Sequence, residues 1–344
     1  MTRSFHAGVG GLRADRDTAV ILLNMGGPES LEQVEPYLTR LFSDRKLIRL
    51  PGGPLLQRPL ARLLARRRAV KSRDHYQQIG GGSPLRYWSE RQAAALEEEL
   101  GEGWRTYILM RYTEPRAQQV VQRLRQDGVR QALVLPLYPQ FAEATSGSGI
   151  ADFQQAVAAL YPELVYSVVP HWYDWPPYLD AMAARVREGL EHFPPEHREQ
   201  VPLLFSAHAM PQKVIDRGDP YLSQVLATAR GLLQRFAGRE WYLGFQSRSG
   251  PVRWTGPALT ALLDQLSRKG RKDVLLVPLS FVSDHVETLY EIDKELQQEA
   301  RRRGITNMVR CPALNDHRDF IRALAALVRQ HRDLAIERDA PSRE

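Results

Sequence analysis

The sequence predicts an α/β protein built from two domains, each a four-stranded parallel sheet flanked by helices, with a cleft between them. The first observation behind this prediction is that short apolar runs alternate with longer amphipathic stretches along the chain. The runs are continuously apolar rather than alternating, which is typical of strands in parallel sheets with helices on both faces. The second observation is that the order and spacing of these runs occur twice.

Eight of the runs are the expected strands, and each should be buried on both faces of its sheet. They cover residues 19–23, 106–110, 132–137, 164–169, 202–205, 241–245, 274–279 and 307–311. The stretches between them are expected helices. Proline near a first turn marks the start of two of these helices, at Thr113-Glu114-Pro115 and at Asp219-Pro220.

The repeat relates the two halves of the chain. Gly128-x-x-x-Ala132 and its apolar run match Gly270-x-x-x-Val274 and its run, which lie 142 residues later. The second and fourth strands of the two halves are offset by about 135 and about 143 residues, but the first strands by roughly 183. The surplus falls between the first and second strands of the first half, which predicts an insertion there.

The repeat and the insertion together predict the domain organisation. We expect a flexible tail at 1–16, a first α/β domain at 17–160 with an insertion at about 29–100, and a second α/β domain at 161–314. A C-terminal helix at 315–334 should pack back on the first domain, followed by a tail at 335–344. Ligands of such folds bind where the carboxyl ends of the strands meet, often between domains.

The positive charge of the chain is concentrated in the expected insertion. The chain has 47 Lys and Arg against 40 Asp and Glu, a net charge of +7, yet residues 45–73 alone hold ten basic residues and no acid. This segment contains no aromatic residue for base stacking, which argues against nucleic-acid binding. Its leucines are interleaved with arginines, which favours a surface that rests on anionic lipid over an ordinary solvated helix face.

The cysteine content and the hydropathy of the chain exclude several kinds of metal site and a membrane-spanning protein. The single Cys311 cannot by itself form an internal disulfide, a thiolate zinc site or an iron–sulfur cluster. No apolar stretch is long enough to span a membrane, and residues 1–16 lack the apolar centre of a secretory signal. We expect a cytoplasmic protein that associates peripherally with a membrane.

Side chains that can bind or react follow the expected strand ends of both halves, where they should meet in one cleft. They include Arg111, Tyr112, Tyr138, His208, Ser247, Asp284, His285 and Glu287. His208 has two interpretations: a core histidine bonded to a backbone carbonyl, or a base at the mouth of the cleft. Glycine-rich segments at 80–82 and 145–149 match no nucleotide fingerprint, so a conformational role is the better interpretation.

Four glutamates, Glu287, Glu291, Glu295 and Glu299, are spaced by four and should lie on one face of a helix. The ordinary interpretation is a solvated acidic face. However, like charges at this spacing repel, and the row starts at the end of an apolar strand rather than at a surface turn. A partly buried row of this kind would hold divalent metal ions or pass protons along its length.

Seven motifs occur in order over residues 18–332. They are Leu23-Asn24-Met25-Gly26-Gly27-Pro28, Ile79-Gly80-Gly81-Gly82-Ser83-Pro84, Arg111-Tyr112, Tyr138-Pro139-Gln140, Phe205-Ser206-Ala207-His208, Gln246-Ser247-x-x-Gly250-Pro251-x-x-Trp254 and Phe281-x-Ser283-Asp284-His285-x-Glu287-Thr288-Leu289-Tyr290-Glu291. Together they resemble the motifs of the ferrochelatase family. The resemblance implies two Rossmann-type domains around a porphyrin cleft, and insertion of Fe²⁺ into protoporphyrin IX to form protoheme, the last step of heme synthesis.

The resemblance also implies roles for individual residues. His208 and Glu287 match the catalytic pair, in which the histidine accepts pyrrole protons or binds the metal. A path for protons or metal would continue from Glu287 through Glu291, Glu295, Asp284 and His285. The chemistry needs such groups, because a neutral imidazole can take a proton and carboxylates can carry it to water.

Other matches surround the expected porphyrin. Met25, Arg111 and Tyr112 would lie on the metal-side face, and Arg68 near the propionates. Further substrate contacts would come from Tyr76, Ser83, Tyr138, Tyr221, Ser247 and Trp254. The insertion matches the family's lip over the cleft, in which Leu41, Phe42 and Leu47 would contact the membrane and the porphyrin.

Two departures from the family pattern bear on the expected cofactor and on the expected substrate. Some members bind a [2Fe–2S] cluster through four cysteines, but Glu143 stands at the first of these positions and the other three have no counterpart in this sequence. We therefore expect no permanently bound cofactor, with Fe²⁺ as a substrate. Met25 favours protoporphyrin IX, because enzymes acting on coproporphyrin III typically carry tyrosine there.

The motifs leave alternatives open. A chelatase for coproporphyrin III or another metal fits them, and so does a porphyrin or heme carrier without turnover, although a carrier needs no proton path. A nucleotide-dependent oxidoreductase is disfavoured, because no glycine fingerprint follows the first strand. The expected partners are protoporphyrin IX, Fe²⁺ and an anionic membrane surface, with no nucleic acid; a monomer and a homodimer fit equally.

Overall fold

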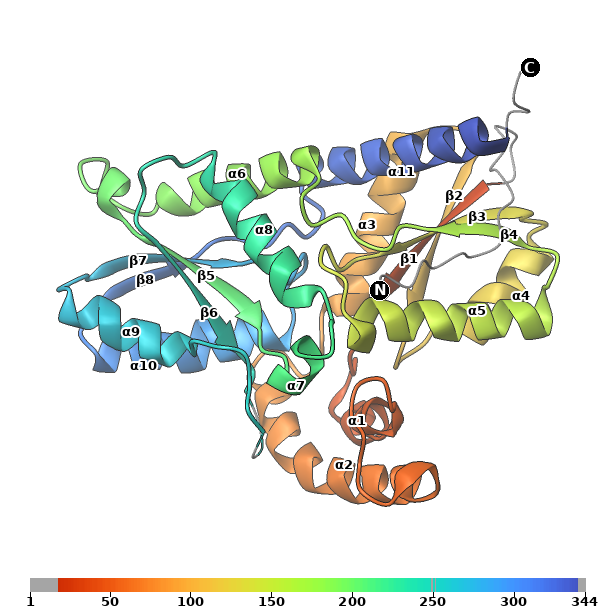
Figure 1. Cartoon of the computed structure of the whole chain (residues 1–344), viewed down its shortest axis with the longest axis horizontal. Helices are drawn as coiled ribbons and strands as arrows, with labels where there is room; N and C mark the ends of the chain where they lie inside the picture. The colour runs from red at the N-terminus through yellow and green to blue at the C-terminus, as the bar shows by residue number, and fades with distance from the viewer. Residues whose placement is uncertain (1–17, 249, 251, 340–344) are drawn as a thin grey trace.

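The chain forms two four-stranded sheets in which all strand pairs are parallel, with helices on both faces, as the sequence predicts (Figure 1). This is seen in a computed structural model that describes residues 18–248, 250 and 252–339. The expected tail at 1–16 lies outside the described residues. The strands are β1 (Thr18–Asn24), β2 (Trp104–Met110), β3 (Gln131–Pro136), β4 (Val165–Val168), β5 (Leu203–His208), β6 (Trp241–Gln246), β7 (Asp273–Pro278) and β8 (Asn307–Arg310).

The two sheets share one topology, which bears out the repeat. The strand orders are β2-β1-β3-β4 and β6-β5-β7-β8, so each strand of the first half has its counterpart at the same place in the second. The third strand of each half is followed by a π-helix, η2 (Glu143–Gly147) and η4 (Glu287–Leu296). Two short 3₁₀ turns, η1 (Leu31–Gln33) and η3 (Arg198–Gln200), precede α1 and β5.

The predicted domain limits need two corrections. The boundary between 160 and 161 is too early, because β4 pairs with β3 and so belongs to the first sheet. The C-terminal helix α11 (Arg318–Asp339) begins and ends later than expected, so part of the predicted tail at 335–344 is helical. This helix packs against both α3 (Leu85–Leu100) of the first half and α6 (Pro176–Leu190), which follows β4.

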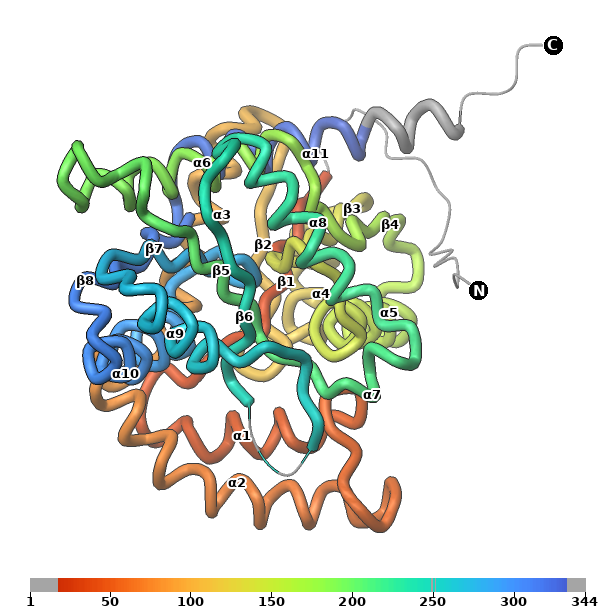
Figure 2. Tube along the Cα trace, turned by 60° about the vertical axis from the view of Figure 1, so that its left-hand side comes forward, coloured from red at the N-terminus to blue at the C-terminus, as the bar shows by residue number. Residues whose placement is uncertain are grey.

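The insertion contains two parts with different positions. The turn η1 and the helices α1 (Val34–Ser43) and α2 (Gly53–Gln77) project from one end of the molecule, and we call residues 31–77 the lip (Figures 1 and 2). By contrast, α3 lies on the first sheet against β1 and β2. The remaining helices are α4 (Ala117–Gln126), α5 (Ser148–Leu160), α7 (Gln212–Ile215), α8 (Tyr221–Leu233), α9 (Leu259–Arg268) and α10 (Gln297–Arg302).

Burial of the strands follows their place in the sheet. The central strands β1, β3, β5 and β7 are buried almost throughout, as predicted. The prediction is wrong for the edge strands β2, β4, β6 and β8, most of whose residues are only partly buried. The reason is that an edge strand has a neighbour on one side only, which a continuous apolar run in the sequence does not reveal.

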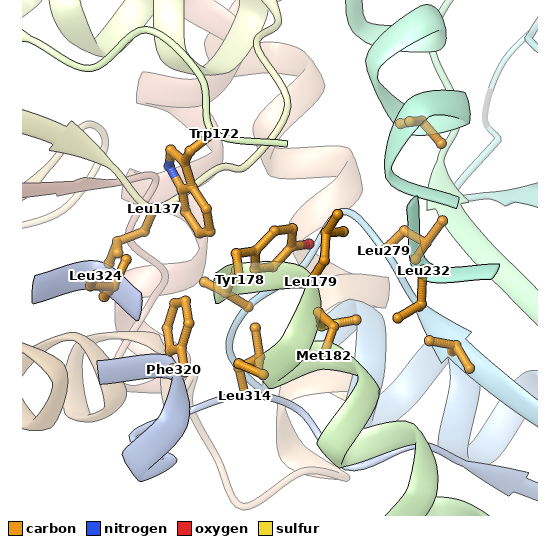
Figure 3. Packing of buried hydrophobic residues seen from close by; sticks show 14 of the residues in the cluster. Leu137, Trp172, Tyr178, Leu179, Met182, Leu232, Leu279, Leu314, Phe320 and Leu324 are labelled. Atoms are coloured by element: carbon orange, nitrogen blue, oxygen red, sulfur yellow. The ribbon is translucent and has the colours of Figure 1, made fainter. Parts of the chain in front are cut away.

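The largest hydrophobic cluster joins the two halves into one body. It combines side chains of both sheets with side chains from α3, α6, α8 and α11. Figure 3 shows part of it, where the Trp172 ring lies 4.9 Å from that of Tyr178 and 6.0 Å from that of Phe320. The Trp172 indole also donates to the Pro136 carbonyl at the end of β3 (2.9 Å). This shared core fixes the two sets of strand ends relative to each other.

Candidate functional site

The lip meets the carboxyl ends of the strands over a small apolar cluster. Its buried members come mainly from α1 and α2, among them Tyr37 and Tyr76, together with Tyr112 after β2. Met25 after β1 and Val286 at the start of η4 pack against it. Residues of the lip, the first sheet and the second sheet therefore share one site, as the strand-end pattern predicts.

Buried phenols line this site. Desolvation raises the pKa of Tyr37, Tyr76, Tyr112 and Tyr138 well above the usual value. The charge of Glu287 adds to the rise at Tyr37, Tyr76 and Tyr138, which places this carboxylate within electrostatic range of all three. The site thus offers neutral hydroxyl groups to an apolar ligand.

His208 is the last residue of β5 and is partly exposed at the strand end. Its Nδ1 lies 2.7 Å from the Ala209 carbonyl. Because a carbonyl oxygen can only accept, Nδ1 carries the proton and the Nε2 of the neutral ring keeps its lone pair. The Tyr221 hydroxyl supports the backbone here by donating to the His208 carbonyl (3.0 Å). The backbone bond of the first interpretation is present, and the role of His208 as a base stays a prediction.

His285 and Glu287 form a pair in the second half of the site. His285 Nε2 lies 3.0 Å from Glu287 Oε2, and His285 Nδ1 lies 2.9 Å from the Ser283 carbonyl. Since Nδ1 donates to that carbonyl, a hydrogen bond between Nε2 and the carboxylate needs one further proton between the two groups. The Phe281 ring lies between the two histidines, 4.4 Å from the His285 ring and 6.4 Å from the His208 ring. This arrangement can take up one more proton, on the other carboxylate oxygen, while its hydrogen bond persists.

Glu291 is the next carboxylate of the row and sits on the same π-helix. Its Oε2 accepts from Ser247 Oγ (2.5 Å) and from Gln246 Nε2 (3.1 Å). Desolvation, reinforced by the charge of Glu287, raises its pKa to about 7. Glu291 is therefore balanced between its two protonation states near neutral pH, which suits a group that passes protons.

The backbone around Glu291 departs from the ordinary pattern twice. Ser247 adopts a φ of +61°, a left-handed conformation that is rare for serine, and this brings its hydroxyl to the carboxylate. The helix that carries the row is a π-helix rather than the α-helix that a four-residue spacing predicts. A π-helix is wider than an α-helix and is frequent at functional sites.

The row leads from the interior to the surface. Glu291, Glu295 and Glu299 line a pocket of about 410 Å³ together with Ser247 and Arg248. At its outer end Glu299 pairs with Arg302 (2.7 Å) and Arg303, and hydrogen bonding lowers its pKa. Glu299 is therefore held in ion pairs with two arginines, and its burial is partial, like that of Glu287 and Glu291.

Asp284 precedes the glutamate row, and its carboxylate contacts side chains outside the row. It pairs with Arg310 (3.0 Å) and accepts from the Thr288 hydroxyl (3.1 Å) and the Asn315 amide (2.9 Å). These contacts fix the start of η4 to β8 and the loop after it. They favour a positioning role for Asp284 over the place in the proton path that we expected.

Sequence reasoning missed Asp44, which joins the lip to the first half of the site. Its carboxylate accepts from Tyr112 (2.8 Å), from Ser148 and from the Lys46 amide (2.8 Å), and it pairs with Arg111 (3.0 Å). Burial opposes ionisation, but these hydrogen bonds lower the pKa of Asp44 below its usual value. The only signal in the sequence is that Asp44 directly precedes the basic segment.

Comparison with known proteins agrees with this geometry. A family model described as ferrochelatase matches residues 17–332. The chain belongs to the ferrochelatase family. It is 45% identical to a ferrochelatase from Geotalea daltonii over 91% of this chain and 97% of that one, and 45% identical to a Synechocystis ferrochelatase over 90% and 81%. This protein is therefore a metal-inserting lyase that acts on a tetrapyrrole in heme synthesis.

Solved structures show the same fold at low sequence identity. SirB from Bacillus subtilis, determined with Fe³⁺, matches with a TM-score of 0.55 at 12% identity, covering 93% of this chain and 98% of that one. No group of three or more His, Cys, Asp or Glu side chains in the described part of this protein is arranged to hold a metal ion. His208 and Glu287 therefore stay predictions as metal ligands.

Two glycine-rich loops of the protein pack against each other in the first half of the site. Ser83 donates its amide to the Pro28 carbonyl (2.6 Å). Gly26 has a φ of +79°, and a Cβ on Gly82 would lie 2.3 Å from the Glu29 carbonyl. The segment at 80–82 therefore has the conformational role that we expected, since a side chain at Gly82 would clash with the backbone. The same holds for 145–149, where a Cβ on Gly149 would lie 2.7 Å from the Leu23 side chain.

The remaining predicted residues are Trp254, near His208, and four residues of the lip. Trp254 is half-buried, and its backbone pairs with Pro211 just after β5, near His208. Arg68 is exposed on α2. Leu41, Phe42 and Leu47, the predicted membrane contacts, are partly buried and pack on hydrophobic clusters instead. The exposed apolar side chains of the lip are Leu55, Leu56, Leu63 and Val70, all on α2.

Proposed function

We propose that this protein inserts Fe²⁺ into protoporphyrin IX, with His208 accepting pyrrole protons and with Glu287, Glu291 and Glu295 carrying protons or metal. The observation that carries this proposal is the state of Glu291. Its pKa of about 7, at the junction between the His285–Glu287 pair and the outer pocket, makes it a proton carrier at neutral pH.

The reaction requires the macrocycle to lose two N–H protons as the metal enters. The free Nε2 of His208 accepts a proton as a general base. The His285–Glu287 pair can accept one proton without losing its hydrogen bond, and Glu291 can pass a proton on to exposed Glu295. Each step moves a proton toward a more solvated group, which keeps the interior from accumulating charge.

The first half of the site supports the apolar substrate. Met25 and the protonated tyrosines offer a surface without net charge. We propose that Arg111 and Tyr112, held by Asp44, shape the metal-side face. Met25 also supports protoporphyrin IX as the substrate.

The test is a metallation assay under anaerobic conditions. Purified protein with Fe²⁺ or Zn²⁺ should convert the four-band spectrum of protoporphyrin IX to the two-band spectrum of the metalloporphyrin. His208→Ala and Glu287→Ala should lower turnover at least a hundredfold, because each removes a proton acceptor. Glu299→Ala is the matched control and should keep turnover within twofold, because Glu299 is held in ion pairs with two arginines.

The same assay separates the alternatives. A wild-type rate no higher than background would overturn the proposal. A higher rate with coproporphyrin III would identify that porphyrin as the substrate. Metallation limited to one equivalent per protein, unaffected by His208→Ala, would identify a carrier.

We also propose that the protein contacts an anionic membrane through the lip. Among the described residues, no helix is both long enough and apolar enough to span a membrane. Leu56, Leu63 and Val70 are exposed, and their seven-residue spacing places them in one row on α2. Basic residues stand on both sides of this row, an arrangement typical of a helix that lies in the lipid interface.

A further inference from the structure

The helices α1 and α2 of the lip pack side by side (Figure 2). Residues of both helices line a groove in the lip. It has a volume of about 560 Å³. Its lining is almost entirely polar or charged, with Glu32, Glu35, Thr39, Arg40, Arg62, Arg66 and Arg73 around Pro36. The composition and position of this groove set it apart from the apolar site under the lip.

The groove carries an excess of positive charge. Four arginines face only two glutamates. Glu35 divides its carboxylate between Arg66 (3.4 Å) and Arg73 (3.7 Å), and all three side chains are more than a third exposed. Such exposed ion pairs are weak, because water screens both partners. The guanidinium groups are therefore available to a stronger anion.

Two of the four arginines of the groove donate to backbone carbonyls, and the other two are exposed. Arg73 donates its Nε to the Leu31 carbonyl (3.2 Å), and Arg40 donates to the Tyr112 carbonyl (3.1 Å). Arg62 and Arg66 are exposed at the mouth of the groove. Four guanidinium groups around one space, two of them bonded to backbone carbonyls, suit a tetrahedral oxyanion, which arginine binds through paired N–H donors.

The groove lies beside the apolar row of α2. Arg62 precedes Leu63 by one residue, and Arg66 follows it by three, so their side chains occupy the flank of the helix next to Leu63 and Val70. A lipid whose chains touch the apolar row would bring its headgroup to this flank.

We propose that the α1–α2 groove binds the phosphate of an anionic lipid headgroup. This inference rests on the proposed membrane contact and makes it specific: the arginines of the groove bind one phosphate, rather than adding only to a diffuse positive field. The groove would then fix how the lip sits on the membrane.

The test compares two variants that lose the same charge. Arg62→Gln/Arg66→Gln empties the mouth of the groove, and Arg58→Gln/Arg67→Gln removes two exposed arginines of the same helix that do not line it. Affinity is measured by sedimentation with vesicles of phosphatidylglycerol in phosphatidylcholine at fixed ionic strength. Circular dichroism checks that both variants fold.

We expect the groove variant to lose at least tenfold more affinity for the vesicles than the control variant. Equal losses would overturn the inference and show that diffuse charge attracts the lip. The inference would also be overturned if the wild-type protein bound glycerol phosphate in solution as tightly as it binds vesicles. The groove would then be a site for a free phosphate compound.

Two further measurements keep the proposals distinct. Leu63→Ser should weaken vesicle binding if the lip contacts the membrane. If Leu63→Ser weakens binding and the two arginine variants lose affinity equally, the groove proposal is overturned and the membrane contact stands. Metallation of detergent-dispersed porphyrin should be unchanged in every variant, because none of these residues lines the site beneath the lip.

Discussion

Glu291 shows how opposing local effects adjust one side chain to its task. Desolvation and the charge of Glu287 raise its pKa, whereas hydrogen bonds from Ser247 and Gln246 lower it, and the balance is about 7. The same balance has a cost for stability. Above its ordinary pKa the unfolded chain ionises Glu291 freely, whereas the native protein resists ionisation until about pH 7.

We therefore predict that Glu291→Gln stabilises the fold at pH 8. Because the native pKa is raised, the native state binds more protons than the unfolded state between about pH 4.5 and 7, and stability falls as pH rises through this window. The neutral amide avoids this loss, so the variant should gain about 1–3 kcal/mol at pH 8 and little at pH 4.5. Urea unfolding at both pH values measures this, and an equal effect at the two would contradict it. Metallation should fall sharply in the same variant.

Asp44 gives a second prediction for a single residue. Asp44→Asn keeps the shape of the side chain but removes the charge that faces Arg111 and accepts from Tyr112. We expect a loss of about 1–3 kcal/mol in unfolding free energy, because buried charged hydrogen bonds are lost. Turnover should fall about tenfold in a metallation assay if Arg111 and Tyr112 shape the metal-side face.

The control for Asp44 is Asp180→Asn, which breaks an exposed ion pair with Arg235. It should change stability by no more than about 0.5 kcal/mol. If Asp44→Asn behaves like this control in both measurements, Asp44 does not position the site.

At the level of elements, strands were easier to predict than the details of helices. All eight strands lie where continuous apolar runs predict them, because a buried strand needs little beyond its own side chains and neighbours. The π-helix η4 was not predicted, since a four-residue spacing fits an α-helix and the contacts of Glu291 with Ser247 and Gln246 form only in the folded chain. The motifs located the residues of the site, but the contacts of Asp44 and Tyr37 arise only when the lip folds over the strand ends.

The helix α2 leads to a prediction about membrane contact. Leu63→Ser/Val70→Ser should weaken sedimentation with anionic vesicles at least tenfold, because each exposed apolar side chain that enters lipid contributes about 1–2 kcal/mol. Unfolding free energy should stay within about 0.5 kcal/mol, because both side chains face solvent in the free protein.

The control for α2 is Val252→Ser, which changes an equally exposed apolar residue outside the lip. Vesicle binding should be unaffected by it. A similar loss in the two variants would mean that the membrane does not contact α2.

At the scale of the whole molecule, the shared core makes the two halves unfold as one unit. Phe320 on α11 is fully buried and lies 6.0 Å from Trp172, which follows the first sheet. Phe320→Ala should lower the unfolding free energy by about 3–5 kcal/mol and leave one transition, because the cavity lies in a core to which both sheets contribute.

Urea unfolding followed by tryptophan fluorescence and by far-ultraviolet circular dichroism measures this. Coincident transitions are expected in the wild type and in the variant. Two separated transitions, of which only one moves, would show that the halves fold independently.

The matching sheet orders also bear on the ancestry of the chain. Glu143 opens η2 and Glu287 opens η4, so the two carboxylates occupy equivalent places in the two halves. In one half the carboxylate holds Lys46 of the lip (2.6 Å), and in the other it pairs with His285 (3.0 Å). Fusion of two copies of a half-length ancestor would produce this pattern, because duplication frees one of two equivalent carboxylates to hold the lip while the other pairs with a histidine.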